Sequence, residues 1–280
     1  MGLLSGMDEY GLKQFEDADI LEGTHPEDKL SQALKVENKA PAFNEEEVLF
    51  DKHYTCPVCD CTFTAKSVRT GKVRLLGQDI DLRPVYDKVD VLKYDVIVCD
   101  KCGYSSLIRY FGKLTVKQTR DIKSTIGINF KGINNDKPVY TYNDAIARYK
   151  LALVTAVVKK AKVSEKGYIC LKLSWIIRGK LKEKNLSAEE RKKLSVEEIS
   201  YVKNAYTALL QALSNENLPI AGMDENTLKY VLAYMAYRLE KNDEAIKLLG
   251  QIIMSKGANE RLKDKARELK ELLKSKAANQ

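Results

Sequence analysis

The sequence predicts an α+β protein in which a small antiparallel β module precedes an all-α half. Three observations support this: apolar and polar residues alternate between residues 73 and 98, two Cys-x-x-Cys pairs enclose that stretch, and apolar residues recur at helical spacing after residue 141. A chain of 280 residues suffices for one large or two medium domains. We expect an acidic leader at 1–47, a β domain at 48–112, a linker at 113–140 and a helical domain at 141–275.

The expected leader differs from the rest of the chain in charge. Residues 1–48 carry 12 acidic and 4 basic side chains, whereas the remainder carries 27 acidic and 43 basic ones. Apolar residues follow no steady period in the acidic stretch, so we expect it to be disordered. Such a tail can solubilise the protein, cover its own basic surface or discourage nonspecific contact with nucleic acid.

Two Cys-x-x-Cys pairs are the motif whose chemistry the sequence specifies best. Such a turn directs two thiolates at one point, and two turns side by side complete the tetrahedral sulfur cage that suits Zn²⁺. Gly103, just after the second pair, lets the backbone turn so that its N–H groups face the sulfurs. We expect one Zn²⁺ per chain, bound by Cys56, Cys59, Cys99 and Cys102. Iron in a rubredoxin-like site uses the same four sulfurs and is the alternative metal.

The stretch between the two pairs gives the β domain its individual character. Thirty-nine residues separate Cys59 from Cys99, enough for a hairpin inserted into an elongated zinc ribbon. The polar side chains of the insertion form either a small recognition surface or the solvated face of a sheet. They are Arg69, Arg74, Asp79, Asp81, Arg83 and Tyr86.

Three further residues are candidates for the site. Cys61 adds a thiol beside the first pair and could replace Cys59 as a ligand or form a disulfide, although four thiolates already complete a structural site. His53 precedes the first pair by three residues, and we expect an exposed strand position for it. Cys170 lies between apolar residues of a predicted helix, which places it in the core.

Capping patterns mark where the helices of the second half begin. Residues 141–144, 187–190 and 195–198 each combine a hydroxyl side chain with an acidic residue three positions later, as in a capping box. Apolar stripes follow each of these positions. We expect about six or seven helices joined by short turns, arranged as an antiparallel helical-hairpin array.

One stretch of this half is similar to a tetratricopeptide repeat. Residues 230–257 place Ala233 and Ala236 where small residues allow two helices to cross closely, but the spacing is one residue short and the usual proline is missing. A tetratricopeptide-like array has a concave face for a peptide or a partner helix. The alternative is a plain helical bundle in which these alanines belong to the core.

The order of these motifs resembles the bacterial DUF2225 family. The resemblance covers roughly residues 48–250, and its most specific part is the two Cys pairs with Asp79-x-Asp81 between them. It implies a cytoplasmic bacterial protein with a cysteine-bound metal and repeat-like helices, but no established reaction. The chain departs from the family pattern at Asp60, where a glycine often follows the first pair, and at the extra thiol Cys61.

The sequence lacks the parts of common catalytic sites. It has no phosphate-binding Gly-rich loop, no Gly-x-Ser-x-Gly elbow and no His-Glu-x-x-His motif, and only two histidines. We therefore expect a noncatalytic zinc-binding adaptor that holds a protein partner on its helical surface. No run of about 18 apolar residues is present to span a membrane, and six cysteines, four of them in the two Cys pairs, suit a reducing compartment where thiols stay available for metal, so we expect a cytoplasmic protein.

Two other functions remain open at this level. The basic part of the chain could bind nucleic acid, and Cys56-Pro57-Val58-Cys59 could perform thiol redox chemistry, although the second Cys pair argues against the latter. The basic residues that would contact nucleic acid are Lys66, Arg69, Lys72, Arg74, Lys180, Lys182, Arg191, Lys192 and Lys193.

Overall fold

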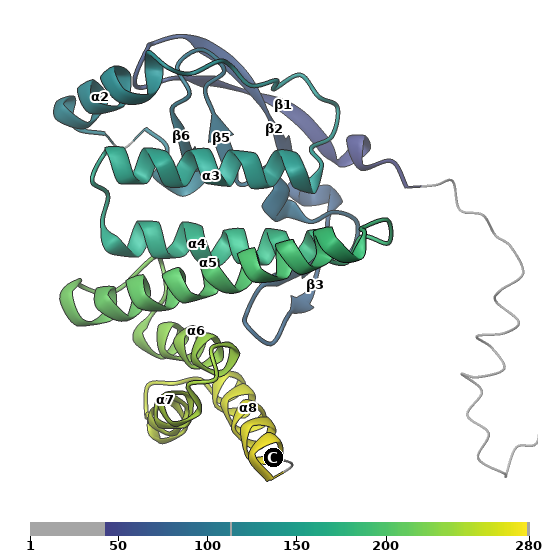
Figure 1. Ribbon diagram of the computed structural model, residues 1–280, viewed down its shortest axis with the longest axis vertical. Helices are drawn as coiled ribbons and strands as arrows, with labels where there is room; N and C mark the ends of the chain where they lie inside the picture. The colour runs from purple at the N-terminus through teal and green to yellow at the C-terminus, as the bar shows by residue number, and fades with distance from the viewer. Residues whose placement is uncertain (1–42, 113, 279–280) are drawn as a thin grey trace, which may run out of the picture. The chain divides into compact units, whose positions relative to one another are not determined.

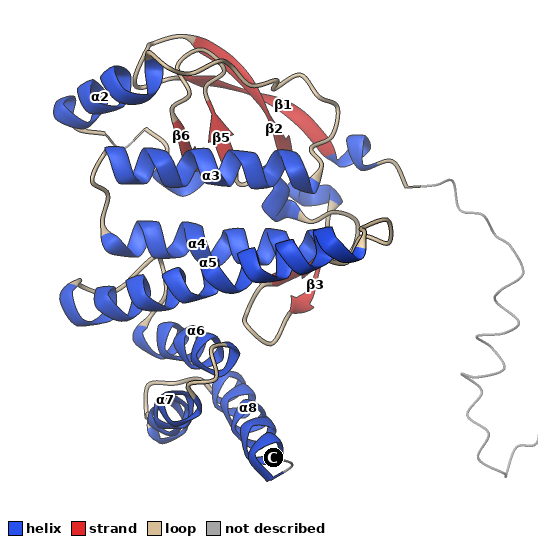
Figure 2. Ribbon diagram, viewed as in Figure 1, coloured by secondary structure: helices blue, strands red, loops and turns tan. Residues whose placement is uncertain are grey.

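The computed structural model describes residues 43–112 and 114–278, so most of the expected leader lies outside the described residues (Figure 1). Residues Glu45–Gln280 form one compact unit. Within it, β-hairpins come first and helices follow (Figure 2). The prediction of antiparallel β-structure followed by a helical half is therefore confirmed.

Three antiparallel hairpins make up the β-structure of the described chain. Their strands are β1 (Leu49–Thr55) with β2 (Thr62–Val68), β3 (Leu75–Gln78) with β4 (Pro84–Tyr86), and β5 (Val96–Val98) with β6 (Ser105–Leu107). The tips of the first and third hairpins carry the two Cys pairs, and the second hairpin is the insertion between them. Val91–Tyr94, expected as strand, instead forms a 3-10 turn (η5), because the Asp90 side chain accepts a hydrogen bond from the Leu92 N–H.

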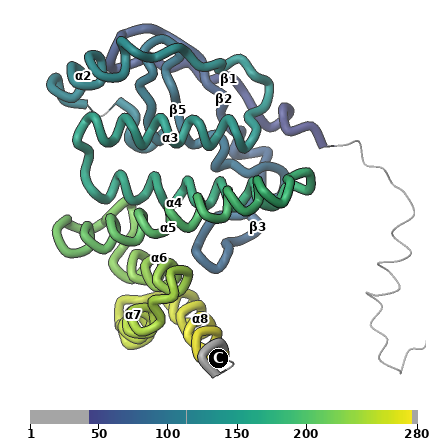
Figure 3. The backbone as a smooth tube through the Cα atoms, in the orientation of Figure 1, coloured from purple at the N-terminus to yellow at the C-terminus, as the bar shows by residue number. Residues whose placement is uncertain are grey.

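Seven helices follow in the described residues, and neighbours in sequence from α3 onward pack against each other (Figure 3). They are α2 (Val116–Ile122), α3 (Tyr142–Val158), α4 (Val163–Lys180), α5 (Ala188–Asn215), α6 (Glu225–Arg238), α7 (Asn242–Met254) and α8 (Glu260–Ala278). The predicted capping boxes at Thr141 and Ser187 are present and begin α3 and α5. Each cap satisfies backbone N–H groups that the first helical turn leaves unpaired.

The third predicted helix start, at Ser195, is wrong. Ser195 lies inside α5, and its hydroxyl donates to the Arg191 carbonyl over 2.8 Å. Glu198, the expected partner of the cap, is buried and pairs with Arg238 of α6 over 2.5 Å. A buried ion pair between two helices therefore uses the carboxylate that the local pattern assigned to a cap.

The expected linker contains a short helix that the sequence analysis missed. Thr115 and Gln118 form a capping box that begins α2, and one turn of π-helix (η7, Lys123–Gly127) continues it. Ile122 and Ile126 of this segment are buried. The Thr115-x-x-Gln118 pattern was a readable signal, but seven helical residues are too few for a clear apolar period.

The hydrophobic core crosses the expected boundary between the β domain and the helical domain. Leu92, Val96 and Leu107 belong to the same buried cluster as Tyr149 and Ala152 of α3. Helix α3 lies against β5 and β6 (Figure 1). The Tyr149 hydroxyl also donates to the Leu92 carbonyl over 3.0 Å. The packing of α3 on β5 and β6 therefore gives the β domain and the helical half one shared core.

The inserted hairpin is fastened to the helices by buried polar groups. Asp81 is 2% exposed and accepts hydrogen bonds from Trp175 Nε1 and Arg178 Nη2, each over 2.6 Å. The Tyr230 hydroxyl of α6 donates to the Ile80 carbonyl over 2.7 Å. Arg83 is also buried and pairs with Asp90.

Neither of the two expectations for the insertion fits Asp81 and Arg83. They belong neither to a recognition surface nor to a solvated face, because α4 covers Asp81 and Asp90 pairs with Arg83. The other polar residue of the motif, Asp79, lies 3.4 Å from Arg83 and 3.8 Å from Arg178. The Asp-x-Asp segment therefore joins the insertion to the helical half.

We expect Asp81→Ala to lower the free energy of unfolding by about 3 kcal/mol, because it leaves the Trp175 N–H and the Arg178 charge without their buried acceptor. Asp51→Ala is the control: the Asp51 side chain is 53% exposed in its pair with Lys66, so the loss should stay below about 1 kcal/mol. Urea denaturation of both variants measures the difference. Equal losses would show that the buried pair has no special role.

Candidate metal centre

The first Cys pair lies in the tip loop of the β1–β2 hairpin, whose shape is set by two backbone hydrogen bonds. The Cys56 N–H donates to the Cys61 carbonyl over 3.0 Å, and the Asp60 N–H donates to the Cys56 carbonyl over 3.0 Å. The Val58 N–H points to the Cys56 sulfur at 3.4 Å. These bonds hold the loop closed, with its N–H groups turned toward the sulfur that a metal would share.

The second Cys pair repeats this arrangement at the tip of the β5–β6 hairpin. The Cys99 N–H donates to the Tyr104 carbonyl over 2.9 Å, and the Gly103 N–H donates to the Cys99 carbonyl over 3.0 Å. The spacings are the same as in the first loop. Two hairpins of different sequence therefore present their cysteines on the same backbone scaffold.

The residue after each pair has a left-handed conformation. Gly103 has φ +73°, which a glycine adopts without steric cost, and Asp60 has φ +59°. Aspartate is among the few residues with a side chain that tolerate this region. The departure from the family pattern at Asp60 thus leaves the shape of the loop unchanged.

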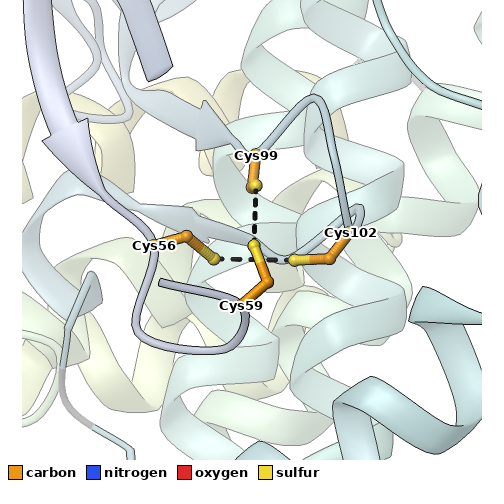
Figure 4. A group of neighbouring side chains, drawn as sticks. All are labelled: Cys56, Cys59, Cys99 and Cys102. Atoms are coloured by element: carbon orange, nitrogen blue, oxygen red, sulfur yellow. Dashed lines mark hydrogen bonds between the residues drawn. The ribbon is translucent and has the colours of Figure 1, made fainter. Parts of the chain in front are cut away.

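The four sulfurs meet between the two loops, as Figure 4 shows. Cys56 Sγ lies 3.5 Å from Cys102 Sγ, Cys59 Sγ lies 3.7 Å from Cys99 Sγ, and all four atoms lie within 4.8 Å of one another. Zinc–sulfur bonds of about 2.3 Å in a tetrahedron separate the sulfurs by about 3.8 Å. None of the four cysteines forms a disulfide. The cluster could therefore hold a metal ion in nearly its present shape.

Hydrogen bonding within the cluster shifts the pKa values of its thiols in opposite directions. Hydrogen bonds from Cys102 and Cys56 lower the pKa of Cys99 to about 2. The pKa of Cys102 is raised by hydrogen bonding to Cys56 and Cys99 and by burial. A hydrogen bond with Cys102 lowers the pKa of Cys56, but donation to Cys99 and burial outweigh it and raise that pKa to about 12. A cation bound to all four sulfurs must displace the retained protons, so its affinity falls as the pH falls.

An apolar layer encloses the buried side of the cluster. Cys56, Cys99 and Cys102 are buried in one cluster with side chains from both cysteine-bearing hairpins and from the α2 segment. Its other buried members are Val58, Phe63, Ala65, Ile97, Tyr104, Ile122 and Ile126. Such a layer excludes water, which strengthens thiolate–metal bonds and protects the thiolates.

A buried polar network holds the strand that leads into the second loop. Asn135 donates from Nδ2 to the Val98 carbonyl over 3.1 Å, and Arg148 Nη1 donates to Asn135 Oδ1 over 2.9 Å. The Arg148 guanidinium carbon lies 3.9 Å from the centre of the Tyr140 ring, and burial lowers the pKa of Arg148. These residues could not be identified from the sequence, because the contacts among Asn135, Tyr140 and Arg148 depend on how residues 128–140 fold back over β5.

The remaining candidates lie outside the group of four. Cys61 is exposed, and hydrogen bonding to Cys59 raises the pKa of its thiol. His53 is exposed on β1, opposite Thr64 of β2. Cys170 is buried in α4, where burial raises its pKa to about 11.

Fold and site together define the class: an α+β protein with a candidate four-cysteine metal centre joined to a helical half. A family model described as an uncharacterized protein conserved in bacteria (DUF2225) matches residues 49–273. The chain belongs to this family, and the match includes both Cys pairs and most of the helices. No curated protein and no solved structure matches the chain. None of the described helices is long and apolar enough to cross a membrane.

We expect the purified protein to contain about one metal ion per chain, and Cys102→Ser to lose it because a tetrahedral site cannot close on three thiolates. Cys170→Ser is the control and should keep its metal, since that thiol lies in α4 outside the cluster. Elemental analysis of both variants and the wild type provides the test. Folded wild-type protein without metal would contradict the assignment.

Gly103→Ala should weaken the second loop by about 2 kcal/mol and speed metal loss. An added Cβ would lie 2.6 Å from the Phe130 ring, and the positive φ would become strained. Gly71→Ala is the control, because a Cβ added at that position would meet nothing within 4 Å. Transfer of the metal to a chromogenic chelator measures the rate, and equal rates in the two variants would reject the role of Gly103.

Proposed function

We propose that the protein is a noncatalytic zinc-binding adaptor that holds a protein partner on its helical half. Four protein thiolates complete a tetrahedral coordination sphere and leave no position for substrate or water, as in structural zinc sites. Zinc is the metal we propose because closed four-thiolate sites are typical of structural zinc, and iron in a rubredoxin-like site is the alternative that would use the same four sulfurs. The same closure supports a structural rather than a catalytic role.

The observation that carries the adaptor proposal is a groove in the helical surface. A cavity of about 420 Å³ opens between α3, α4 and α5, lined largely by apolar side chains such as Leu153, Val157 and Tyr201. Val157 is 59% exposed, so part of the apolar lining of this cavity is open to solvent. A groove of this kind suits the apolar face of a partner helix.

The charge at the groove defines the partner further. Lys166 is the charged residue of the lining, while Asn204, Thr207 and Gln211 supply neutral polar groups. An amphipathic helix with an acidic residue at the edge of its apolar face would complement this surface. We therefore propose such a helix as the partner.

The metal centre is connected to the groove through α3. Val158, at the end of α3, packs on the cluster that contains the cysteines, and its neighbour Val157 lines the groove. Gln118 of α2 also donates to the Lys159 carbonyl just after α3, over 2.9 Å. Binding of zinc would thus fix the end of the helix that forms one wall of the groove.

The zinc-ribbon-like and tetratricopeptide-like descriptions belong to this proposal. The shared hydrogen-bond pattern of the two Cys loops supports the first. Close packing of α6 and α7 supports the second, but Ala233 and Ala236 are fully buried. These alanines therefore belong to the core, and bulky replacements there would unfold the protein rather than block a partner.

Nucleic-acid binding is the weaker alternative. Several of the basic residues that would contact phosphates are engaged within the protein: Arg191 donates to the Leu181 and Glu183 carbonyls, and Lys66 pairs with Asp51. The carboxylate of Asp51 offsets the charge of Lys66, and the two carbonyl contacts engage the N–H donors of Arg191 that would otherwise contact a phosphate. The helical groove, in contrast, is not filled by any other described part of the chain.

We expect Val157→Glu to reduce retention of the protein partner at least about tenfold, because it places a charge in the apolar groove. Val196→Glu is the matched control: Val196 is 67% exposed on α5 and lies outside the groove lining. Full-length tagged chains expressed in their native cell, followed by quantitative mass spectrometry, compare the two. Equal retention would reject the groove, and captured nucleic acid with steep salt dependence would favour the alternative.

A further inference from the structure

The cysteine cluster has one side that solvent can reach. Cys56 and Cys99 are fully buried and Cys102 is 6% exposed, whereas Cys59 is only partly buried. Cys61, two residues further along the same loop, is exposed. A small oxidant arriving from solvent therefore meets Cys59 and Cys61 before it meets the other three sulfurs.

The loop geometry allows these two cysteines to be joined. A single residue, Asp60, separates them, and its left-handed φ of +59° folds the chain between them. Even a fully extended chain separates residues two apart by no more than about 7 Å. A folded loop brings their Cα atoms into the range of about 4.4 to 6.8 Å that a disulfide spans. Within the group of four, the sulfur contacts Cys56–Cys102 and Cys59–Cys99 join different hairpins, and Cys56, Cys99 and Cys102 are more deeply enclosed than Cys59.

We propose that Cys59 and Cys61 form a peroxide-sensitive pair that opens the metal centre. The inference rests on the proposed zinc site, where Cys59 is held as a thiolate. The role of Cys61 is then to resolve the oxidised cysteine, a role for which a thiol outside the coordination sphere is suited.

The chemistry balances with a peroxide as the oxidant. The Cys59 thiolate attacks one oxygen of hydrogen peroxide, the O–O bond breaks, and hydroxide leaves, so that Cys59 becomes a sulfenic acid. The Cys61 sulfur then attacks the Cys59 sulfur, its proton and the departing hydroxyl form water, and the Cys59–Cys61 disulfide results. The two electrons lost by the thiols equal those gained by the peroxide. With three sulfurs left, the metal loses its tetrahedral site.

Reduction would reverse the change. A small thiol attacks the Cys61 sulfur of the disulfide and releases the Cys59 thiolate. A second small thiol then attacks the mixed disulfide, frees the Cys61 thiol and leaves as the disulfide of the two small thiols, so that the four-sulfur cluster can bind metal again. Without Cys61, the sulfenic acid lacks a neighbouring thiol on the exposed side and can pass to the sulfinic acid, which thiols do not reduce. Cys61 would therefore make the loss of metal reversible.

The test uses the full-length, metal-loaded protein treated with hydrogen peroxide. Metal release is followed with a chromogenic chelator, disulfides are mapped by mass spectrometry, and zinc is then offered again after reduction with a thiol. The wild type should release its metal, show a Cys59–Cys61 disulfide and regain the metal. Cys61→Ser should bind metal normally before peroxide but regain much less afterwards, with Cys59 found as the sulfinic acid. Cys170→Ser is the matched control and should behave as the wild type.

The outcomes separate this inference from the proposed function. A wild type without metal before peroxide would overturn the zinc site and this inference with it. A metal-loaded wild type whose disulfide joins other cysteines would overturn this inference alone. The same follows if Cys61→Ser regains its metal as fully as the wild type, with circular dichroism confirming that both are folded.

Discussion

The convergence of four sulfurs from two hairpin tips is the constraint on which the β region depends. A two-stranded hairpin is marginally stable in water, and the described β-structure consists only of such hairpins. The sulfur cluster joins the tips of the first and third, while the apolar side chains around it, including Ile122 and Ile126, attach the α2 segment to the same point. A bound cation would balance the charge of four thiolates held this close together.

Buried polar contacts attach the rest of the β region to the helices. Asp81 meets Trp175 and Arg178 of α4, and Arg148 of α3 reaches the strand before Cys99 through Asn135. These groups are costly to bury unless they are paired, so each contact tolerates few alternative arrangements. These contacts therefore fix the position of the β region on the helical core, as the proposed adaptor role would require.

This arrangement links the proposed roles of the metal and the helices. The end of α3 contacts the cysteine cluster, and the preceding turn forms a wall of the groove between α3, α4 and α5. A change at the exposed side of the cluster, where Cys59 and Cys61 lie, would therefore alter the position of the groove wall through the end of α3. Helix α3 is therefore the element through which the proposed partner binding and the proposed oxidation would be coupled, because it belongs to the hydrophobic core and borders both sites.

The sequence by itself determined the features that local patterns encode. The Cys-x-x-Cys spacing singled out the four cysteines that the structure brings together, and the capping boxes at Thr141 and Ser187 located two helix starts. Only the tertiary structure decided the uses of Asp81 and Glu198, whose carboxylates pair with residues of distant segments. It also showed that Ala233 and Ala236 lie in the core, and that the groove lies between α3, α4 and α5. The physical reason is that turn and cap geometry depends on neighbours along the chain, whereas burial and ion pairing depend on which helix covers which surface.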